Sequence, residues 1–261
     1  MTLYKYHGAG NDFILADNRN QTFPNNPDTI ELLCHRRFGI GADGLILLEN
    51  DSDTDFYMRY FNADGYEGTM CGNGGRCVVA FAQKLGIIKD TTVFNSVDGL
   101  HEASIRYNEP TSVVKLKMGN VSNVISANGY YELNTGSRHY VQLVDDLSKV
   151  DIVNEGRKIR HSAAFAPEGI NVNFIELQNN SILIGTFERG VEDETLACGT
   201  GAIAAAIASY LHSNLQEPAN YTLQAKGGKL MVCFDKPQNG VFTNIWLEGP
   251  AAYVFETEIA L

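Results

Sequence analysis

Many short stretches of the chain are rich in apolar residues and are bounded by polar or turn-forming residues, which is a pattern typical of strands. The stretches that read as strands are residues 4–16, 44–49, 56–61, 92–95, 103–107 and 113–118. Three other segments have helical spacing, residues 28–37, 76–85 and 202–211. Pro27-Asp28 can cap the first of them. The pattern predicts a mixed α/β (α+β) fold.

The two later helices have almost no polar face, since Val78, Val79 and Phe81 follow one another closely in the first and residues 202–211 are nearly all apolar. A helix that is apolar all round must be surrounded by other structure. The neighbouring strands are the natural cover. We therefore expect each half of the chain to be a curved, mostly antiparallel sheet wrapped around a central helix.

Each of these helices follows the same short motif, CGNGG at Cys71 and CGTGA at Cys198. Two further pairs of similar segments, or echoes, precede the motifs in the same order in each half. Phe61-Asn62 is answered by Phe187-Glu188, and GNDFIL (residues 10–15) is answered by NVNFIE (residues 171–176). Three ordered echoes predict an internal duplication and two pseudo-symmetric domains.

The best break between the halves is the polar run Asn108-Glu109-Pro110-Thr111-Ser112. It predicts an N-terminal domain of residues 1–111 and a C-terminal domain of residues 112–249. A last strand, residues 250–261, is expected to return to the first domain.

Composition narrows the choice of ligand. The 261 residues carry 20 Lys and Arg against 31 Asp and Glu, a net charge of -11, which argues against nucleic acid and anionic membranes as partners. No segment approaches the roughly 18 apolar residues of a membrane span. Five cysteines, an odd number, fit free thiols in a reducing compartment. We expect a cytoplasmic protein that acts on a small, solvated ligand.

A glycine-rich turn that opens a helix presents free backbone N–H groups and the positive end of the helix dipole to an anion. A cysteine at the same place is favoured as thiolate, so one thiol and one thiolate can coexist near neutral pH. Inverting a carbon next to a carboxylate needs a base on one face and an acid on the other. Cys71 and Cys198 therefore predict two-base proton transfer.

Free cysteines also have two other common roles, as core residues and as zinc ligands. A lone free cysteine is more often core than catalyst, but the duplication of these two inside matched loops reverses that preference. Zinc is disfavoured because Cys71 and Cys77 do not form a C-x2-C pair and no histidine pair lies nearby. Cys34, Cys77 and Cys233 lack such a loop and read as structural.

Several polar residues are candidates for binding a zwitterion. Arg189 can clamp a carboxylate and Glu188 can bind an ammonium group, although such a pair is usually surface decoration. Four asparagines at expected strand ends or turns can offer amides or can simply form turns: Asn11, Asn62, Asn73 and Asn171. The sequence leaves open whether His139 has a structural or a catalytic role.

These residues lie in motifs that strongly resemble those of the diaminopimelate epimerase family, nearly from end to end of the chain. The motifs are HGAGNDF (7–13), FGIGADG (38–44), FNADG (61–65), MCGNGGRC (70–77), GINVNF (169–174) and FERGVEDETLACGTGA (187–202). Enzymes of this family interconvert LL- and meso-2,6-diaminopimelate without a cofactor, in lysine and peptidoglycan-precursor biosynthesis. The resemblance implies an isomerase with no cofactor and no metal.

The resemblance also implies roles for individual residues. Cys71 and Cys198 would exchange the roles of base and acid with the direction of reaction, supported by Glu188 and His139. The residues implied to bind the reacting carboxylate are Gly72, Asn73, Gly199 and Thr200. Those implied to hold the amino groups and the distal carboxylate are Asn11, Asn62, Asn171, Glu188 and Arg189. Two domains that close over the substrate, and a homodimer, are implied as well.

The chain departs from the family pattern at two places. Gly44 stands where some relatives have a substrate-contacting Gln, and Ser137-Arg138 replaces the usual Asn-Pro before His139. Ser137 can still donate or accept a hydrogen bond. Two competing functions remain, a proline or hydroxyproline racemase and a non-catalytic amino-acid-binding relative. The second has no need of both thiols.

Overall fold

The computed structural model describes residues 1–108, 111–127, 129–214, 220–235 and 237–259. The chain forms two compact units. Unit 1 comprises Met1–Leu116 and Gly249–Leu261, and unit 2 comprises Lys117–Glu248.

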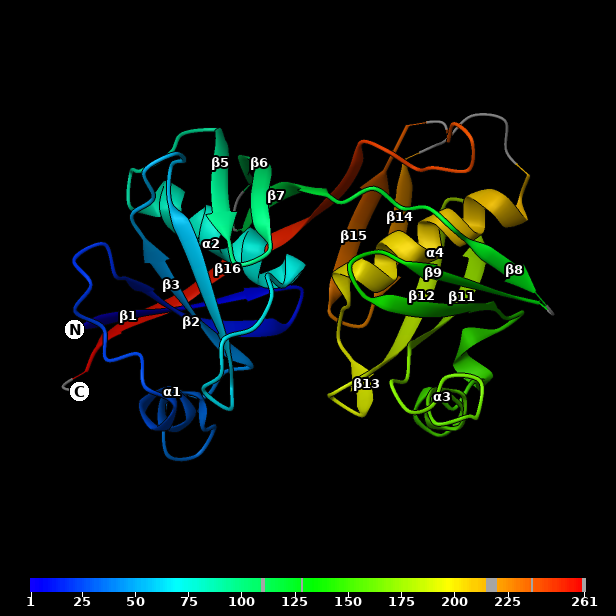
Figure 1. Cartoon of the computed structure of the whole chain (residues 1–261), viewed down its shortest axis with the longest axis horizontal. Coiled ribbons are helices and arrows are strands. Elements are labelled where there is room, and N and C mark those ends of the chain that lie inside the picture. The colour runs from blue at the N-terminus through cyan, green and yellow to red at the C-terminus, as the bar shows by residue number, and fades with distance from the viewer. Residues whose placement is uncertain (109–110, 128, 215–219, 236, 260–261) are drawn as a thin grey trace. The chain divides into compact units, whose positions relative to one another are not determined.

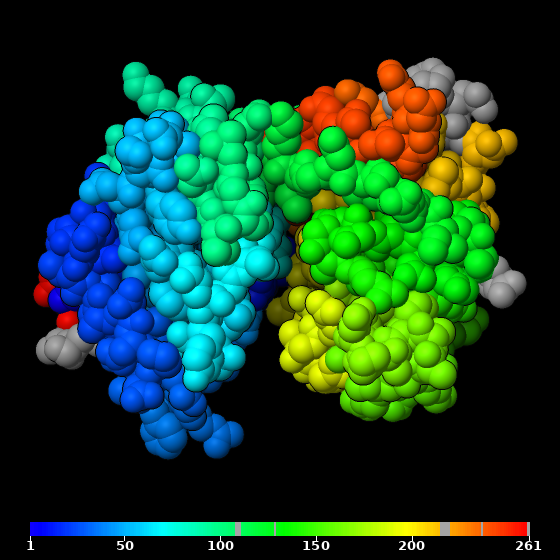
Figure 2. Space-filling view, in the orientation of Figure 1, coloured from blue at the N-terminus to red at the C-terminus, as the bar shows by residue number. Residues whose placement is uncertain are grey.

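Unit 1 is one sheet that closes on itself. Its elements are β1 (Thr2–Gly8), β2 (Asn11–Asp17), α1 (Pro27–Cys34), β3 (Gly44–Glu49), β4 (Tyr57–Asn62), α2 (Gly72–Lys84), β5 (Thr91–Ser96), β6 (Gly99–Asn108), β7 (Thr111–Met118) and most of β16 (Ile245–Glu258). The strands follow the order β1-β2-β3-β4-β5-β6-β7-β16, and β16 also pairs with β1. In Figure 2 the red atoms of the last strand accordingly lie beside the blue atoms of the first.

Helix α2 lies inside this sheet, in contact with β1, β2, β3, β4 and β6 (Figure 1). Every residue from Gly72 to Ala82 is buried, including the whole of Arg76. The apolar spacing of the sequence predicted this burial, and the enclosing strands supply the cover that such a helix requires.

Unit 2 has the same construction around α4. Its elements are β8 (Ile125–Ala127), β9 (Tyr130–Asn134), β10 (Arg138–Leu143), the 3-10 turn η1 (Leu147–Lys149), α3 (Ile152–Arg160), β11 (Asn171–Gln178), β12 (Ser181–Glu188), β13 (Asp193–Thr195), α4 (Gly199–His212), β14 (Tyr221–Ala225), β15 (Gly228–Cys233) and the start of β16. The strands follow the order β16-β15-β14-β12-β11-β10-β9-β8, with β13 beside β12. Helix α4 contacts β9, β10, β11, β12, β14 and β15 (Figure 1).

The two units repeat one topology. In unit 1, β2 and β3 are parallel and joined through α1, β4 returns antiparallel, and the helix after the first cysteine leads to β5, parallel to β4. In unit 2, β10, α3, β11, β12, α4 and β14 do the same in turn. The predicted fold class, with a duplicated and mostly antiparallel sheet around a central helix, is confirmed.

One of the three sequence echoes joins strands that are not equivalent. GNDFIL lies on β2 and NVNFIE on β11, whereas the topology matches β2 with β10 and β3 with β11. Asn171, the first residue of β11, therefore corresponds in topology to Gly44, the first residue of β3. The echo arose because both segments are asparagine-led starts of buried strands.

Two predicted elements differ in extent. Residues 4–16 form two strands, because Ala9 and Gly10 turn the chain with φ of 55° and 89°. The first helix ends at Cys34, short of the predicted residue 37. The next residue, His35, is extended, and its ring Nδ1 accepts the backbone N–H groups of residues 37 and 38, each at 3.1 Å.

The expected break at residues 108–112 lies within unit 1. Asn108 and Thr111 pair at the end of the antiparallel strands β6 and β7, while Glu109 and Pro110 lie outside the described residues. The division between the units falls after Leu116 instead. The final strand begins at Ile245, before the expected residue 250, and pairs with β1 along the expected stretch.

Candidate active site

Cys71 is the N-cap residue of α2, with an extended backbone (φ -91°, ψ 129°). The helix begins at Gly72, four residues earlier than predicted, so the glycine-rich motif forms its first turn. The first N–H groups of a helix point away from it and suit an anion, while the N–H of Gly75 bonds back to the carbonyl oxygen of Cys71 at 2.7 Å. A side chain on Gly74 or Gly75 would press against Ile46 at 3.1 Å or Met70 at 3.0 Å, which explains why small residues open this buried helix.

Asn11 and Asn73 lie beside the Cys71 thiol. The Sγ atom of Cys71 is 3.7 Å from Oδ1 of Asn11, and Nδ2 of Asn73 donates to the same oxygen at 3.1 Å. Oδ1 of Asn73 accepts from the buried Arg76 at 2.7 Å. Unit 1 thus brings together three of the predicted residues, with Asn73 in the first turn of the helix.

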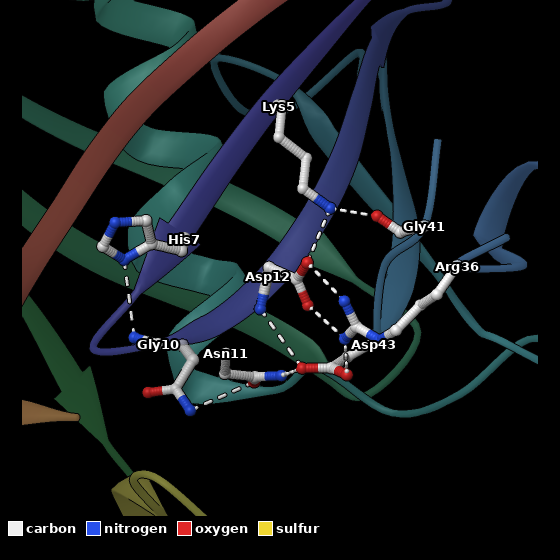
Figure 3. Close-up of polar contacts among 9 residues, drawn as sticks. Lys5, His7, Gly10, Asn11, Asp12, Arg36, Gly41 and Asp43 are labelled. Atoms are coloured by element: carbon white, nitrogen blue, oxygen red, sulfur yellow. Dashed lines mark hydrogen bonds and ion pairs between the residues drawn. The ribbon is translucent and has the colours of Figure 1, made fainter. Parts of the chain in front are cut away.

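A network of charges fixes the orientation of Asn11 (Figure 3). Its Nδ2 donates to Asp43 at 2.6 Å, and Arg36 donates to both Asp43 and Asp12. Lys5, which is only 8% exposed, donates to Asp12 at 2.7 Å and to the carbonyl oxygen of Gly41. Burial alone would raise the pKa of Asp12, but the hydrogen bonds from Arg36 and Lys5 hold it well below its usual range. This network was not predicted, although Asp12 and Asp43 lie in two of the family motifs.

At Gly44 the structure explains one departure from the family. A Cβ atom there would lie 2.5 Å from the carbonyl oxygen of Phe61 and 2.6 Å from the ring of Tyr60. Tyr60 is buried against this glycine, and its hydroxyl donates to Oδ1 of Asn62 at 3.0 Å. The aromatic ring therefore occupies the space next to residue 44, and its hydroxyl reaches the predicted binding residue Asn62.

In unit 2, Cys198 is the N-cap of α4, again with an extended backbone (φ -114°, ψ 114°). The N–H of Gly201 donates to its Sγ at 3.4 Å, and the Thr200 hydroxyl lies 3.4 Å from the same sulfur. Cys198 is 8% exposed. A Cβ on Gly201 would lie 2.5 Å from Oδ1 of Asn173, which favours glycine in this turn.

His139 lies next to this second cysteine turn. It is fully buried on β10, and its Nε2 is 2.9 Å from both the Thr200 and the Ser137 hydroxyl oxygens. Its Nδ1 is 3.0 Å from Nδ2 of Asn173. Burial, helped by the positive charge of Arg189, lowers the pKa of His139 to about 3. His139 is therefore neutral at physiological pH.

Asn171 uses its amide within the protein. Its Nδ2 donates to the Ser137 hydroxyl at 3.1 Å and to the carbonyl oxygen of Arg138 at 3.2 Å, and its Oδ1 accepts the backbone N–H of Arg189 at 2.8 Å. These contacts link the start of β10 to the loop after β12. Arg138 turns to acidic partners, Glu132 at 2.8 Å and Glu168 at 3.2 Å.

Glu188 ends β12, and Arg189 follows it with an exposed side chain. The loop after them is anchored by Glu192, which accepts from Arg160 at 2.8 Å and His161 at 3.1 Å. An exposed guanidinium on an anchored loop suits the recognition of a carboxylate.

The other cysteines differ from these two. Burial raises the pKa of Cys34 and of Cys77 to about 12, so both remain thiols at neutral pH. Among the described residues, no three His, Cys, Asp or Glu side chains gather closely enough to hold a metal ion. No described helix is both long and apolar enough to cross a bilayer.

Comparison with known proteins identifies the family. Residues 3–124 and 131–253 match the family model described as diaminopimelate epimerase. The chain belongs to the diaminopimelate epimerase family. It is 55% identical to the diaminopimelate epimerase of Flavobacterium psychrophilum over 99% of this chain and 100% of that protein. It is 42% identical to that of Chlorobaculum tepidum, over 97% and 99% of the two chains. As a member of this family, the protein is an isomerase that acts on a small molecule.

Solved structures with little sequence identity share the fold. A PhzF-family phenazine biosynthesis protein of Bacillus anthracis matches with a TM-score of 0.79 at 14% identity, over 100% of this chain and 99% of that chain. A probable proline racemase of Agrobacterium radiobacter matches with a TM-score of 0.70 at 16% identity, over 100% and 93% of the chains. These likenesses show that the chain shares its fold with those two structures.

Proposed function

We propose that this protein interconverts LL- and meso-2,6-diaminopimelate by two-base proton transfer, in lysine and peptidoglycan-precursor biosynthesis. In each direction one of Cys71 and Cys198 removes the α-proton as thiolate, and the other donates a proton to the opposite face as thiol. The observation that carries the proposal is the repeated placement of a cysteine at the N-cap of an enclosed, glycine-opened helix in each unit of a diaminopimelate epimerase family member.

The reacting carboxylate is assigned to the first turns of α2 and α4, through Gly72, Asn73, Gly199 and Thr200. Helix N-termini stabilise a carboxylate and the charge that develops on it when the α-proton leaves. This chemistry needs no pyridoxal, nucleotide or metal, and we propose that the enzyme uses no cofactor.

The remaining contacts are assigned to the amino groups and the distal carboxylate. Arg189 is exposed and suits the distal carboxylate, with Glu188 beside it for an ammonium group. Asn11 and Asn62 complete the unit 1 side. Asn171, whose amide is bonded within unit 2, would act chiefly by holding the backbone of Arg189.

The first experiment is incubation of the reduced enzyme with LL-diaminopimelate in deuterium oxide, with epimer formation and α-deuterium incorporation followed together. Cys71→Ala and Cys198→Ala should both abolish epimerisation, and Cys233→Ala is the matched control that should retain it. Turnover of proline or hydroxyproline in place of diaminopimelate would assign the protein to that racemase branch. Binding of diaminopimelate without turnover would identify a non-catalytic relative.

We further propose a cytoplasmic homodimer. Support for association comes from the end of β16, where the consecutive residues Tyr253, Val254 and Phe255 are 45%, 50% and 42% exposed. Apolar residues on both faces of a strand end are typical of a contact surface. Light scattering after gel filtration should give twice the chain mass. Val254→Lys should lower it, and Leu32→Lys, at an exposed site on α1, should not.

A further inference from the structure

The hydrogen bonds around His139 have a direction that can be assigned atom by atom, beginning at Asn173. Oδ1 of Asn173 accepts from the Thr186 hydroxyl at 2.9 Å, and Nδ2 donates to the carbonyl oxygen of Tyr140 at 3.0 Å. A carbonyl oxygen only accepts, so the atom facing it must be the amide nitrogen. The second hydrogen of that nitrogen points to Nδ1 of His139 at 3.0 Å, and Nδ1 must therefore accept.

A neutral imidazole that accepts at Nδ1 carries its proton on Nε2. His139 is neutral because burial and Arg189 lower its pKa to about 3. Its Nε2–H therefore donates, shared between the hydroxyl oxygens of Ser137 and Thr200 at 2.9 Å each.

Ser137 likewise accepts hydrogen bonds on its oxygen and donates its own hydrogen toward Thr200. Its oxygen also accepts from Nδ2 of Asn171 at 3.1 Å, an amide whose orientation is fixed by the Arg138 carbonyl oxygen and the Arg189 backbone N–H. With its oxygen surrounded by donors, Ser137 donates its own hydrogen to Oγ1 of Thr200 at 3.2 Å. Thr200 then accepts on its oxygen, and its hydrogen is directed to Sγ of Cys198 at 3.4 Å.

We propose that Ser137 and His139 are positioning residues that hold the Thr200 hydroxyl as a donor to Cys198, so that Cys198 is the thiolate of the resting enzyme. The Gly201 N–H, at 3.4 Å, is a second donor to the same sulfur. Hydrogen bonds donated to a thiolate, at the N-terminus of a helix, stabilise it over the thiol. The inference rests on the proposed function and gives a role to Ser137, one of the departures from the family pattern.

The contacts in unit 1 have the opposite polarity. Nδ2 of Asn11 is held by the Asp43 carboxylate at 2.6 Å, so the carbonyl Oδ1 faces Sγ of Cys71 at 3.7 Å. An acceptor favours the protonated thiol. The buried Arg76 is the charge that opposes this, since its guanidinium interacts with Cys71. In unit 2 the imidazole of His139 on β10 is part of the assigned contacts, and the charge of Arg189 acts on it. Glu188 precedes Arg189 at the end of β12.

The protonation states assigned to the two cysteines determine which of them acts as the base in the first turnover. The Cys198 thiolate takes the α-proton, the C–H bond breaks as the S–H bond forms, and the electron pair passes to the substrate carbon and carboxylate. The Cys71 S–H bond then breaks as its proton is delivered to the opposite face. The enzyme is left with the Cys71 thiolate and the Cys198 thiol, and no oxidant or co-reactant is needed.

Alkylation by iodoacetamide as a function of pH tests the assignment, with each cysteine followed by peptide mass spectrometry in the absence of substrate. In the wild type, the pH of half-maximal alkylation rate should be lower for Cys198 than for Cys71. The pH of half-maximal rate, or midpoint, does not depend on how exposed each sulfur is, whereas the alkylation rate at a single pH does. A lower midpoint for Cys71 would overturn the proposal.

We call the hydrogen bonds that run from Ser137 and His139 through Thr200 to Cys198 the relay. Variants distinguish the loss of this relay from general damage to the fold. Thr200→Val should raise the Cys198 midpoint by about one pH unit, and Thr200→Ser should restore it. Ser137→Ala should raise it by less. Ser209→Ala removes another buried hydroxyl of α4, bonded to the Ala205 carbonyl oxygen at 2.7 Å, and should leave both midpoints unchanged. An unchanged Cys198 midpoint in a folded Thr200→Val protein would contradict the relay.

These measurements need no substrate, so the two proposals fail separately. Epimerisation of diaminopimelate with the midpoints reversed would refute the relay and leave the function standing. The expected midpoints without turnover of any substrate would support the relay and refute the function.

Discussion

The amide nitrogen of Asn11 donates to the Asp43 carboxylate at 2.6 Å, and this contact decides which end of Asn11 faces Cys71. A carboxylate accepts from the nitrogen only, whereas an asparagine at position 43 could bond either end of the amide. The orientation of a predicted binding residue is therefore set by a residue that lies 32 positions away in the sequence.

Asp43→Asn should consequently lower kcat/KM by about ten- to a hundredfold, because a misplaced group near the reacting atoms is costly even when the fold survives. Steady-state kinetics with diaminopimelate measure the effect. Asp17→Asn, at the other end of β2 and paired with Arg19 at 2.6 Å, is the matched control. Equal losses in both variants would mean that the strand, and not the orientation of Asn11, is what Asp43 supports.

Tyr60→Phe should raise KM about three- to tenfold with little change in kcat. The variant loses only the hydroxyl that donates to Asn62 at 3.0 Å, and the ring continues to fill the space beside Gly44. Asn62 is proposed to hold the amino groups and the distal carboxylate, and a hydrogen bond lost behind such a contact weakens substrate and transition state alike. Tyr57→Phe on the same strand serves as the control. A fall in kcat at constant KM would show that Asn62 acts in the chemical step.

The sequence was sufficient to predict the two enclosed helices and the cysteines before them, because an all-round apolar helix after a glycine-rich turn is a local pattern. The position of the boundary between the units was not predictable in the same way. Asn108-Glu109-Pro110-Thr111-Ser112 has the composition of any exposed turn, and a hairpin and a domain break are equally compatible with it. Only the pairing of β6 with β7 distinguishes them.

The contacts of Asn173 with His139 and of Tyr60 with Asn62 were beyond the reach of sequence patterns for a related reason. Asn173 meets His139 because β10 and β11 are parallel with His139 opposite Asn171, and that register is a long-range property. Tyr60 reads as an ordinary apolar strand residue. Its relation to Gly44 appears only when β3 and β4 are paired.

His139 should make the protein less stable in acid. Its folded-state pKa, about 3, lies below the unfolded value of 6.5, so only the unfolded chain binds a proton between these limits. The contribution to stability is complete above pH 6.5 and is lost as the pH falls from there toward 3, at up to about 1.4 kcal/mol per pH unit.

Chemical denaturation at a series of pH values checks this. His139→Gln, which cannot gain the proton, should show a shallower loss of stability between pH 6.5 and 3 than the wild type. His212→Gln alters an exposed histidine at the end of α4 and should keep the wild-type slope. The same slope in wild type and His139→Gln would mean that His139 takes up its proton in the folded protein at its ordinary pKa.

Gly201→Ala should damage the second cysteine turn directly. The added Cβ would lie 2.5 Å from Oδ1 of Asn173 and 3.3 Å from Sγ of Cys198. Asn173 cannot retreat without breaking its bonds to Thr186 and His139, so we expect a loss of about 1–3 kcal/mol in the free energy of unfolding. Because the Gly201 N–H donates to Cys198, the loss in kcat/KM, expressed as a free energy, should exceed the loss in the free energy of unfolding. Gly119→Ala, where the added methyl would meet no atom within 4 Å, should change neither quantity. Thermal unfolding with parallel kinetics separates the two effects, and a Gly201→Ala enzyme with wild-type activity would show that the turn tolerates a shift of Cys198.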